Sequence, residues 1–179
     1  LFYKGRAVHC AGPNGDGGIR ADSAFTAPEP EMAIVVAANG DILGYTLCDD
    51  VSAWDIEREN PLYLPQSKIF RGCAVIGPTI VTPDEVPDPS ALHLRATITR
   101  GGHEIFADEC GVDRMKRTLP ELVHFLRLNN PIQDGTVLST GTGIIVTQDQ
   151  ALHEGDVVTI EASPIGALRH GMRKLPTDA

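Results

Sequence analysis

Three acidic residues, Glu29, Glu31 and Asp50, lie at the two ends of one stretch with the pattern of a β-hairpin. Two apolar, β-branched runs flank Asn39-Gly40, the strongest short-range signal for a hairpin turn. If Asn39-Gly40 forms a two-residue turn, Glu29 lies opposite Asp50 and Glu31 lies opposite Cys48. Side chains alternate along a strand, and cross-strand partners share a face. The register therefore predicts that the three carboxylates converge at the open end of the hairpin.

Carboxylates that face one another destabilise a sheet, so a positive group is expected among them. A site with oxygen ligands and no His or Cys favours a hard divalent cation. We expect Mg²⁺ bound by Glu29, Glu31 and Asp50, with Mn²⁺ or Ca²⁺ as alternatives. The competing interpretation is a solvated acidic edge without a ligand, because a one-residue slip of register would move Asp50 to the other face.

A second candidate site is the loop Thr140-Gly141-Thr142-Gly143, which offers hydroxyls and backbone N–H groups. Such loops bind carboxylate or phosphate oxygens. The loop lacks the Lys-Ser or Lys-Thr ending of a P-loop, so ATP is not expected. One of Lys4, Arg6 and Arg20 could bind an anion, although most such basic residues, and a lone loop lysine such as Lys68, lie on the solvated surface. The six histidines have no metal-ligand spacing, and neither Gly-x-Ser-x-Gly nor His-Glu-x-x-His occurs.

Composition describes an ordinary globular chain of 179 residues, 42% hydrophobic and 22% charged. The net charge of −9 argues against nucleic acid or an anionic membrane as a partner. No apolar run approaches the roughly 20 residues of a membrane span, and the four scattered cysteines favour a reduced, cytoplasmic protein. The chain begins at Leu1 without an initiator Met, so we expect an upstream segment that this sequence lacks.

Element patterns predict one domain over residues 1–179, mainly β with a few short helices (α+β). A short helix is expected over 51–60, with Asp50 or Ser52 as N-cap. The clearest helix signal covers 119–128, where Thr118 and Glu121 form a capping box. Residues after Gly166 show little pattern. Further strands are expected at 68–70, 79–81, 92–99, 103–107, both ends of 135–146, and 157–162.

Several motifs together resemble the catalytic C-terminal domain of the fumarylacetoacetate hydrolase family. They run across nearly the whole chain and are specific as a set. Two positions depart from the usual family pattern, which has Arg at Trp54 and Asn at His170. These departures leave the acidic residues intact but bear on the choice of substrate. The motifs are Glu29-Pro30-Glu31, Gly44-Tyr45-Thr46-Leu47, Asp50-Val51-Ser52-Ala53 with Asp55, Lys68-Ile69-Phe70, Gly77-Pro78, Thr140-Gly141-Thr142-Gly143, Glu154-Gly155-Asp156-Val157-Val158 and Ile165-Gly166-Ala167-Leu168.

The resemblance implies a β-roll or sandwich of mixed sheets, a homodimer, and an enzyme that acts on small 2-oxo acids. It implies that Mg²⁺ is bound by the three acidic residues and that Lys68 is catalytic, facing the substrate. Substrate contacts are expected from Thr140, which would receive a carboxylate, and from Gly141, Lys4 and Gln66. No convincing general base is present, so we expect it in the upstream segment.

A narrower resemblance lies in residues 56–68, which are similar to the branch of 2-keto-3-deoxy-sugar-acid dehydratases, such as the 2-keto-3-deoxy-D-arabinonate enzymes. It implies a Mg²⁺-dependent lyase that removes water from the sugar acid through a metal-stabilised enolate. Two alternatives remain open. One is a C–C hydrolase or decarboxylase of acylpyruvates, oxaloacetate or related diketo acids. The other is a non-catalytic binding domain, although the complete set of acidic residues and Lys68 argues against it.

Overall fold

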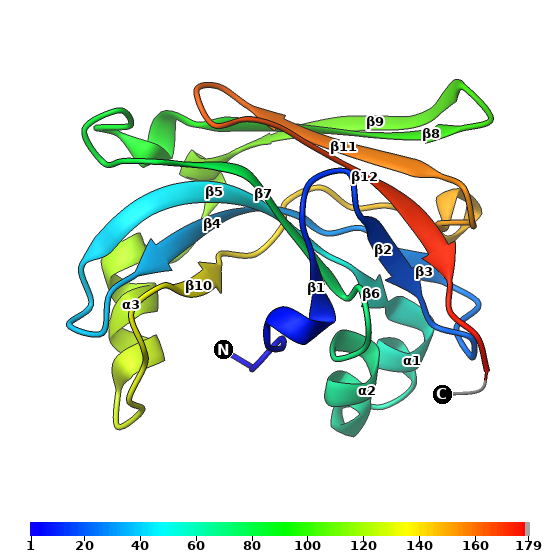
Figure 1. The fold of residues 1–179 in the computed structure, drawn as a ribbon, viewed down its shortest axis with the longest axis horizontal. Helices are drawn as coiled ribbons and strands as arrows, with labels where there is room; N and C mark the ends of the chain where they lie inside the picture. Colours follow the sequence, from blue (N-terminus) through cyan, green and yellow to red (C-terminus); the bar gives the residue numbers. More distant parts are fainter. Residues whose placement is uncertain (178–179) are drawn as a thin grey trace.

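Two five-stranded β-sheets form most of the computed structural model, which describes residues 1–177 (Figure 1). The fold is therefore mainly β with mixed sheets, as the sequence predicted. The first sheet has the order β1-β7-β5-β4-β10, and its strands are Cys10–Ala11, Ala74–Val81, Ile42–Asp50, Pro30–Val36 and Thr136–Ser139. The second has the order β2-β12-β11-β8-β9, and its strands are Asp16–Ile19, Gly166–Lys174, Val157–Ala162, His93–Arg100 and His103–Gly111.

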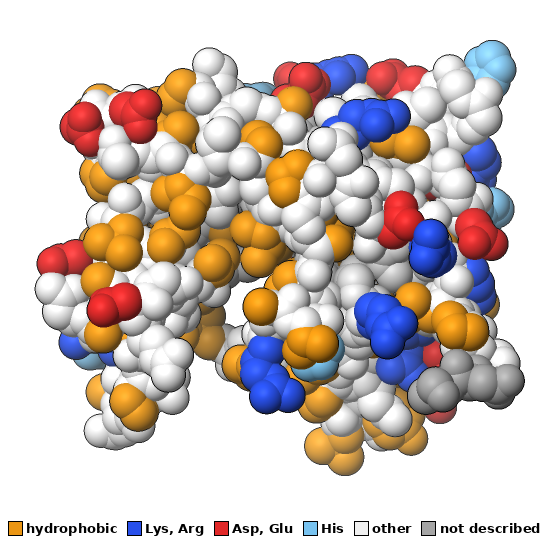
Figure 2. All heavy atoms as spheres, in the orientation of Figure 1, with side chains coloured by type: hydrophobic (Ala, Val, Ile, Leu, Met, Phe, Trp, Pro, Cys, Tyr) orange, Lys and Arg blue, Asp and Glu red, His pale blue; other side chains and the backbone are white. Residues whose placement is uncertain are grey.

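Short elements lie at the ends of the first sheet. Strands β3 (Thr26–Ala27) and β6 (Ser52–Ala53) form a small antiparallel pair. The helices are α1 (Trp54–Glu59), α2 (Leu64–Lys68) and α3 (Leu119–Arg127), and 3₁₀ turns cover Ala7–His9, Pro61–Tyr63, Pro89–Ala91, Val112–Arg114 and Gln148–Gln150. In the described part of the chain, no helix is long and apolar enough to cross a membrane. Figure 2 shows the surface hollowed between the lobe that carries α3 and the lobe that carries α1 and α2.

The core lies between the two sheets, because alternate side chains of each strand point to the same face. From β4, Met32, Ile34 and Val36 are buried in this core, where they join Ile160 and Leu168 of the second sheet. The other face of β4 carries Glu31 and Ala33, which are also buried. Strand β4 is thus enclosed on both faces, and its polar face is the one that can carry a functional site.

The hairpin of β4 and β5 has the predicted register but not the predicted turn. Ala37 N–H donates to Asp41 O at 2.9 Å, and Val36 pairs with Ile42, so the loop is longer than two residues. A bulge between Val35 and Val36 then shifts the pairing by one residue. Beyond the bulge Glu31 pairs with Cys48, as expected, because the longer turn and the bulge compensate each other.

The two helices that follow β5 differ from the sequence expectation. Helix α1 forms within the expected range 51–60, but it is capped by Ala53 without a side-chain hydrogen bond, so neither Asp50 nor Ser52 is its N-cap. Ser52 lies in β6 instead. The strand expected over 68–70 is absent, and Lys68 ends α2. Pro65 lies in the first turn of this helix, where a missing N–H costs no hydrogen bond, so proline did not prevent it.

Three other expectations had mixed outcomes. Helix α3 forms with the predicted capping box, in which the Thr118 hydroxyl accepts from Glu121 N–H and the Glu121 carboxylate accepts from Thr118 N–H. The strand expected at the end of 135–146 is wrong, because the chain after Ser139 runs as an irregular loop. Residues after Gly166 show little pattern in the sequence, yet they form β12. Pairing with β11 and β2 stabilises this strand, which the local sequence does not indicate.

A buried ion pair joins the two sheets below the β4–β5 hairpin. His170 of β12 lies 2.9 Å from Asp49 of β5, Nε2 to Oδ2, and both side chains are fully buried. His170 Nδ1 lies 3.0 Å from Gly171 O, so both ring nitrogens face acceptors and the imidazolium form satisfies both. Burial lowers the pKa of His170, but the hydrogen bond and charge of Asp49 outweigh burial and raise it above its ordinary value.

We predict that His170→Ala destabilises the fold by about 3–5 kcal/mol, because it leaves the Asp49 carboxylate buried and unpaired. Urea unfolding with the metal chelated measures this difference. Since the folded pKa of His170 is raised, its stabilisation is complete below pH about 6.5 and is lost as pH rises through the folded pKa. The difference between the two proteins should therefore narrow at alkaline pH. A pH-independent difference would contradict a charged pair.

Candidate metal centre

Glu29, Glu31 and Asp50 meet on the face of β4 and β5 that points away from the core. Each offers a carboxylate oxygen, and these ligand atoms all lie within 4.8 Å of one another. Glu31 and Asp50 are buried, whereas Glu29 is partly exposed. The hairpin register brings them together, since Asp50 N–H donates to Glu29 O at 3.0 Å and places these two residues opposite each other.

Both glutamates are held by hydrogen bonds to one oxygen. Oε2 of Glu31 accepts from Ser139 Oγ at 2.5 Å and from Gly141 N at 2.6 Å. Oε1 of Glu29 accepts from Trp54 Nε1 at 2.6 Å and from Lys68 Nζ at 2.8 Å. The second oxygen of each carboxylate accepts no hydrogen bond from the described residues. Donors on one oxygen orient the group and leave the other oxygen for a ligand.

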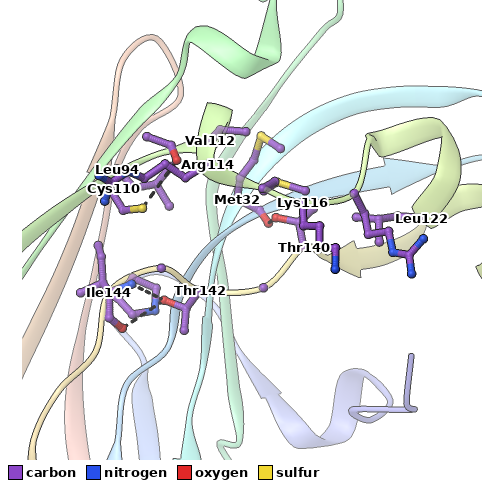
Figure 3. Close-up of a pocket in the computed structure, with 16 residues that line it drawn as sticks. Met32, Leu94, Cys110, Val112, Arg114, Lys116, Leu122, Thr140, Thr142 and Ile144 are labelled. Atoms are coloured by element: carbon purple, nitrogen blue, oxygen red, sulfur yellow. Dashed lines mark hydrogen bonds between the residues drawn. The ribbon is translucent and has the colours of Figure 1, made fainter.

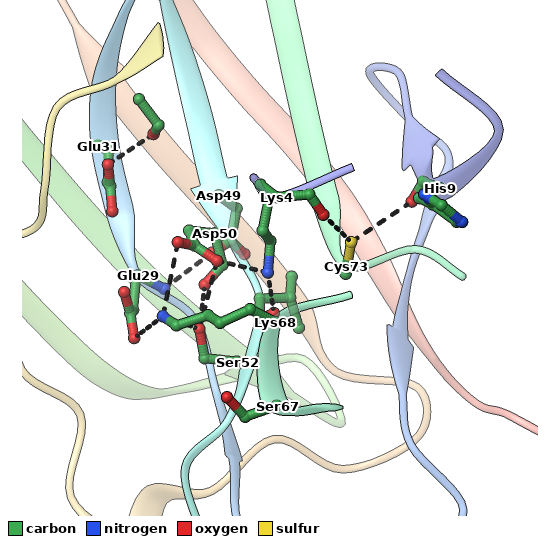
Figure 4. Close-up of polar contacts among 12 residues, drawn as sticks. Lys4, His9, Glu29, Glu31, Asp49, Asp50, Ser52, Ser67, Lys68 and Cys73 are labelled. Carbon is green, nitrogen blue, oxygen red and sulfur yellow. Dashed lines mark hydrogen bonds and ion pairs between the residues drawn. The ribbon is translucent and has the colours of Figure 1, made fainter. Parts of the chain in front are cut away.

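Two lysines contact Asp50, Lys4 from the N-terminal segment and Lys68 from the end of α2 (Figure 4). Lys68 Nζ lies 3.5 Å from Asp50 Oδ2, and Lys4 Nζ lies 2.5 Å from Asp50 Oδ1. Lys68 is 3% exposed, and its ammonium also donates to Ser52 Oγ at 2.5 Å. Because Lys68 is enclosed by oxygen atoms, its position at the end of α2 is fixed beside the carboxylates.

The electrostatic balance of the site is incomplete without a further cation. Burial, followed by the charge of Asp50, raises the pKa of Glu31 to about 7. Burial also raises the pKa of Glu29, and Lys68 offsets this only in part. Burial alone would lower the pKa of Lys68, but Asp50 and Glu29 raise it, so Lys68 stays protonated. Three converging carboxylate oxygens, with two raised carboxyl pKa values, fit a hard divalent cation.

The profile of the family described as Fumarylacetoacetate (FAA) hydrolase C-terminal matches residues 25–173 of this sequence. The chain belongs to the fumarylacetoacetate hydrolase family. The matched range contains the acidic triad, Lys68 and the loop after β10, whereas Lys4 lies outside it.

Relatives within the fumarylacetoacetate hydrolase family include sugar-acid dehydratases. The chain is 45% identical over 174 residues to the 2-dehydro-3-deoxy-D-arabinonate dehydratase of Saccharolobus solfataricus, covering 97% of this chain and 58% of that protein. It is 40% identical over 172 residues to a probable 2-keto-3-deoxyxylonate dehydratase of Haloferax volcanii, covering 96% of this chain and 59% of that protein. The chain therefore spans somewhat more than half the length of these relatives.

A solved structure described as 2-keto-3-deoxy-D-arabinonate dehydratase complexed with magnesium and 2,5-dioxopentanoate shares the fold. It superposes with a TM-score of 0.94 at 45% identity, covering 95% of this chain and 60% of that chain. The same family and the same fold thus occur in a protein that binds magnesium with a small oxo acid.

The residues expected to bind substrate are spread around the triad. Lys4 forms an ion pair with Asp50, and the backbone N–H of Gly141 donates to Glu31. Thr140 donates its hydroxyl proton to Met32 O at 2.7 Å, so this hydroxyl holds the loop to β4. Gln66 is exposed on α2. Its backbone carbonyl oxygen accepts a hydrogen bond from the Arg20 guanidinium at 3.0 Å. Their contacts with substrate stay a prediction.

Sequence reasoning missed several residues that contact the acidic triad. Ser139 donates to Glu31 from a position 108 residues away, and Trp54 donates to Glu29 from α1. Ser52 lies between Asp50 and Lys68. Ser52 and Trp54 lie within four residues of Asp50, so proximity to a candidate ligand was the available signal. No signal in the sequence indicates a contact between Ser139 and Glu31, because the pairing of β10 with β4 brings them together.

A separate cavity of about 340 Å³ lies beside the same loop, on the face of β4 that carries Met32 (Figure 3). Its walls include Leu94, Arg114, Thr140 and Ile144. None of the three acidic residues lines this cavity, nor does Lys68. The loop after β10 therefore separates two environments, with the carboxylates on one side and a mainly apolar pocket on the other.

We predict that Glu31→Gln abolishes Mg²⁺ binding and stabilises the metal-free protein at pH 8. A rise of the pKa from 4.5 to about 7 corresponds to roughly 3 kcal/mol spent on keeping this carboxylate charged. The folded protein holds this proton more tightly, so stability falls as pH rises from 4.5 through 7. Calorimetric titration with Mg²⁺ and urea unfolding in chelator measure the two effects.

Glu154→Gln is the matched control, because Glu154 is exposed and has no ion pair among the described residues. The control should bind Mg²⁺ as the parent does and should show the parent's pH dependence of unfolding. Unchanged Mg²⁺ affinity in Glu31→Gln would remove Glu31 from the metal site. The expected stability gain of Glu31→Gln over the parent is larger at pH 8 than at pH 5. An equal gain at the two pH values would contradict the raised pKa of Glu31.

Proposed function

We propose that this protein is a Mg²⁺-dependent lyase that dehydrates a 2-keto-3-deoxy sugar acid of the 2-keto-3-deoxy-D-arabinonate type. The observation that carries the proposal is the oxygen-only triad beside Lys68, in a chain 45% identical over nearly its whole length to a 2-dehydro-3-deoxy-D-arabinonate dehydratase. Glu29, Glu31 and Asp50 would hold the cation, and Lys68 would be the catalytic residue.

Dehydration of a 2-oxo acid needs positive charge at the keto oxygen when C3 loses its proton. A divalent ion held by the triad supplies a Lewis acid at that oxygen. Lys68 supplies a second positive charge, because the charges of Asp50 and Glu29 keep its ammonium protonated. Its burial keeps water away from the charge and strengthens the interaction. Loss of the C4 hydroxyl, which leaves as water with the C3 proton, forms a C3–C4 double bond, and tautomerisation of this double bond with the C5 hydroxyl gives the C5 aldehyde of the product.

Elimination differs from the alternative C–C hydrolysis in what the site must admit. A hydrolase of acylpyruvates needs an attacking water and a base to activate it, whereas elimination needs no nucleophile.

The proposal includes cytoplasmic location and a homodimer, as expected from the sequence, with a small 2-oxo acid as the partner and neither nucleic acid nor membrane.

Product analysis is the direct test of the lyase. With Mg²⁺ present, the protein should convert 2-keto-3-deoxy-D-arabinonate to 2,5-dioxopentanoate and water, which NMR of the reaction mixture detects. Chelation of Mg²⁺ should stop turnover. Formation of pyruvate and a carboxylic acid from an acylpyruvate, without turnover of the sugar acid, would identify a hydrolase and overturn the proposal.

We predict that Lys68→Met lowers turnover by roughly 100-fold, about 3 kcal/mol, because it removes a preorganised positive charge at the keto oxygen. Mg²⁺ affinity should not fall, since the removed ammonium repels the cation. Lys174→Met is the matched control, because Lys174 is an exposed lysine at the end of β12 on the second sheet. Parallel loss of turnover and Mg²⁺ binding in Lys68→Met would show that Lys68 acts in folding the site instead.

A further inference from the structure

Trp54 is the only tryptophan of the chain, and it lies at the first residue of α1 beside the acidic triad. Its indole Nε1 donates to Glu29 Oε1 at 2.6 Å. We propose that Trp54 is a positioning residue, whose N–H determines which oxygen of Glu29 is presented to the cation. This inference rests on the proposed metal site and adds to it a residue that packing alone does not explain.

The geometry at Glu29 separates its two oxygens. Oε1 accepts from Trp54 Nε1 at 2.6 Å and from Lys68 Nζ at 2.8 Å. No described residue donates to Oε2. Two donors on one oxygen fix the rotation of the carboxylate about its last bond and leave Oε2 as the metal-facing atom. Orientation of a ligand by its outer hydrogen-bond partners commonly sets metal affinity.

The indole is itself held in place from both sides. Its ring packs edge-on against Phe25, with centroids 5.5 Å apart, and the Arg58 guanidinium lies 4.6 Å from its centroid. The backbone N–H of Trp54 donates to Phe25 O at 2.8 Å, and the next residue, Asp55, accepts from Ser23 Oγ at 2.7 Å. The ring therefore cannot turn without breaking several contacts, so its single N–H is a rigid donor.

Lys68 alone does not provide this orientation. Its ammonium is a point charge with rotatable donors, shared among Glu29, Asp50, Ser52 and Glu57. Glu29 is also the most exposed of the three acidic residues, with 13% of its side chain accessible. Water competes for its oxygens more than for those of Glu31, so a fixed donor has the largest effect at this ligand.

Within these 179 residues, replacement of tryptophan in an auxotrophic host changes this position alone. β-(Benzothiophen-3-yl)alanine puts sulfur in place of the indole N–H and keeps the shape of the ring. 5-Fluorotryptophan keeps the N–H and is the matched control. Calorimetric titration with Mg²⁺ should give a 10- to 100-fold weaker affinity for the benzothiophene protein than for the control.

The ¹⁹F signal of 5-fluorotryptophan gives an independent readout. It should shift when Mg²⁺ is added to the control protein and should not shift in the same protein with Glu29→Gln. Trp54→Phe repeats the affinity measurement in a variant made only of natural residues, with the same expected loss. Thermal unfolding of each protein separates loss of packing from loss of orientation.

Equal Mg²⁺ affinity in the benzothiophene and fluorotryptophan proteins would overturn the positioning role of Trp54 and leave the proposed function standing. A lower melting temperature with unchanged affinity would assign Trp54 to packing and overturn the inference as well. Absence of Mg²⁺ binding by the parent protein would overturn both the inference and the proposed metal site.

Discussion

Repulsion among three converging carboxylates is the constraint on which the site depends. Carboxylate oxygens of Glu29, Glu31 and Asp50 cannot lie within 4.8 Å of one another unless donors and cations balance their charge. The fold meets this need from distant parts of the chain, with Lys4 from the N-terminal segment and Lys68 from α2. The residual imbalance appears in the raised pKa of Glu31, which a divalent ion would remove.

One end of β5 shows how a strand serves two purposes. Asp49 and Asp50 are consecutive, so their side chains point to opposite faces of the first sheet. Asp49 enters the core, pairs with His170, and accepts the backbone N–H of Glu29 at 2.9 Å. Asp50 points into the site. The buried pair therefore anchors the backbone of one candidate metal ligand while the next residue supplies another.

Much of the site could be predicted from sequence because it depends on local signals. Asn39-Gly40 marked the hairpin, and alternation placed Glu29 and Glu31 on one face. The register was right even though the turn was not, since the bulge at Val35 restored it. The contact of Ser139 with Glu31 and the formation of β12 depend on pairing between distant strands, which local patterns do not encode.

Holding the three carboxylates close together lowers the stability of the fold, and this destabilisation is limited to the few residues of the site. Keeping Glu31 charged opposes folding, but strand β4 around it is paired on both sides by β5 and β10 and packs its other face into the core. A rigid sheet can hold an unfavourable cluster that a loop would relax by moving apart. The hydrogen bonds to Glu29 and Glu31 then direct one free oxygen of each toward the same point. The charge imbalance is thus both a destabilising feature and the source of affinity for a cation, because binding removes it.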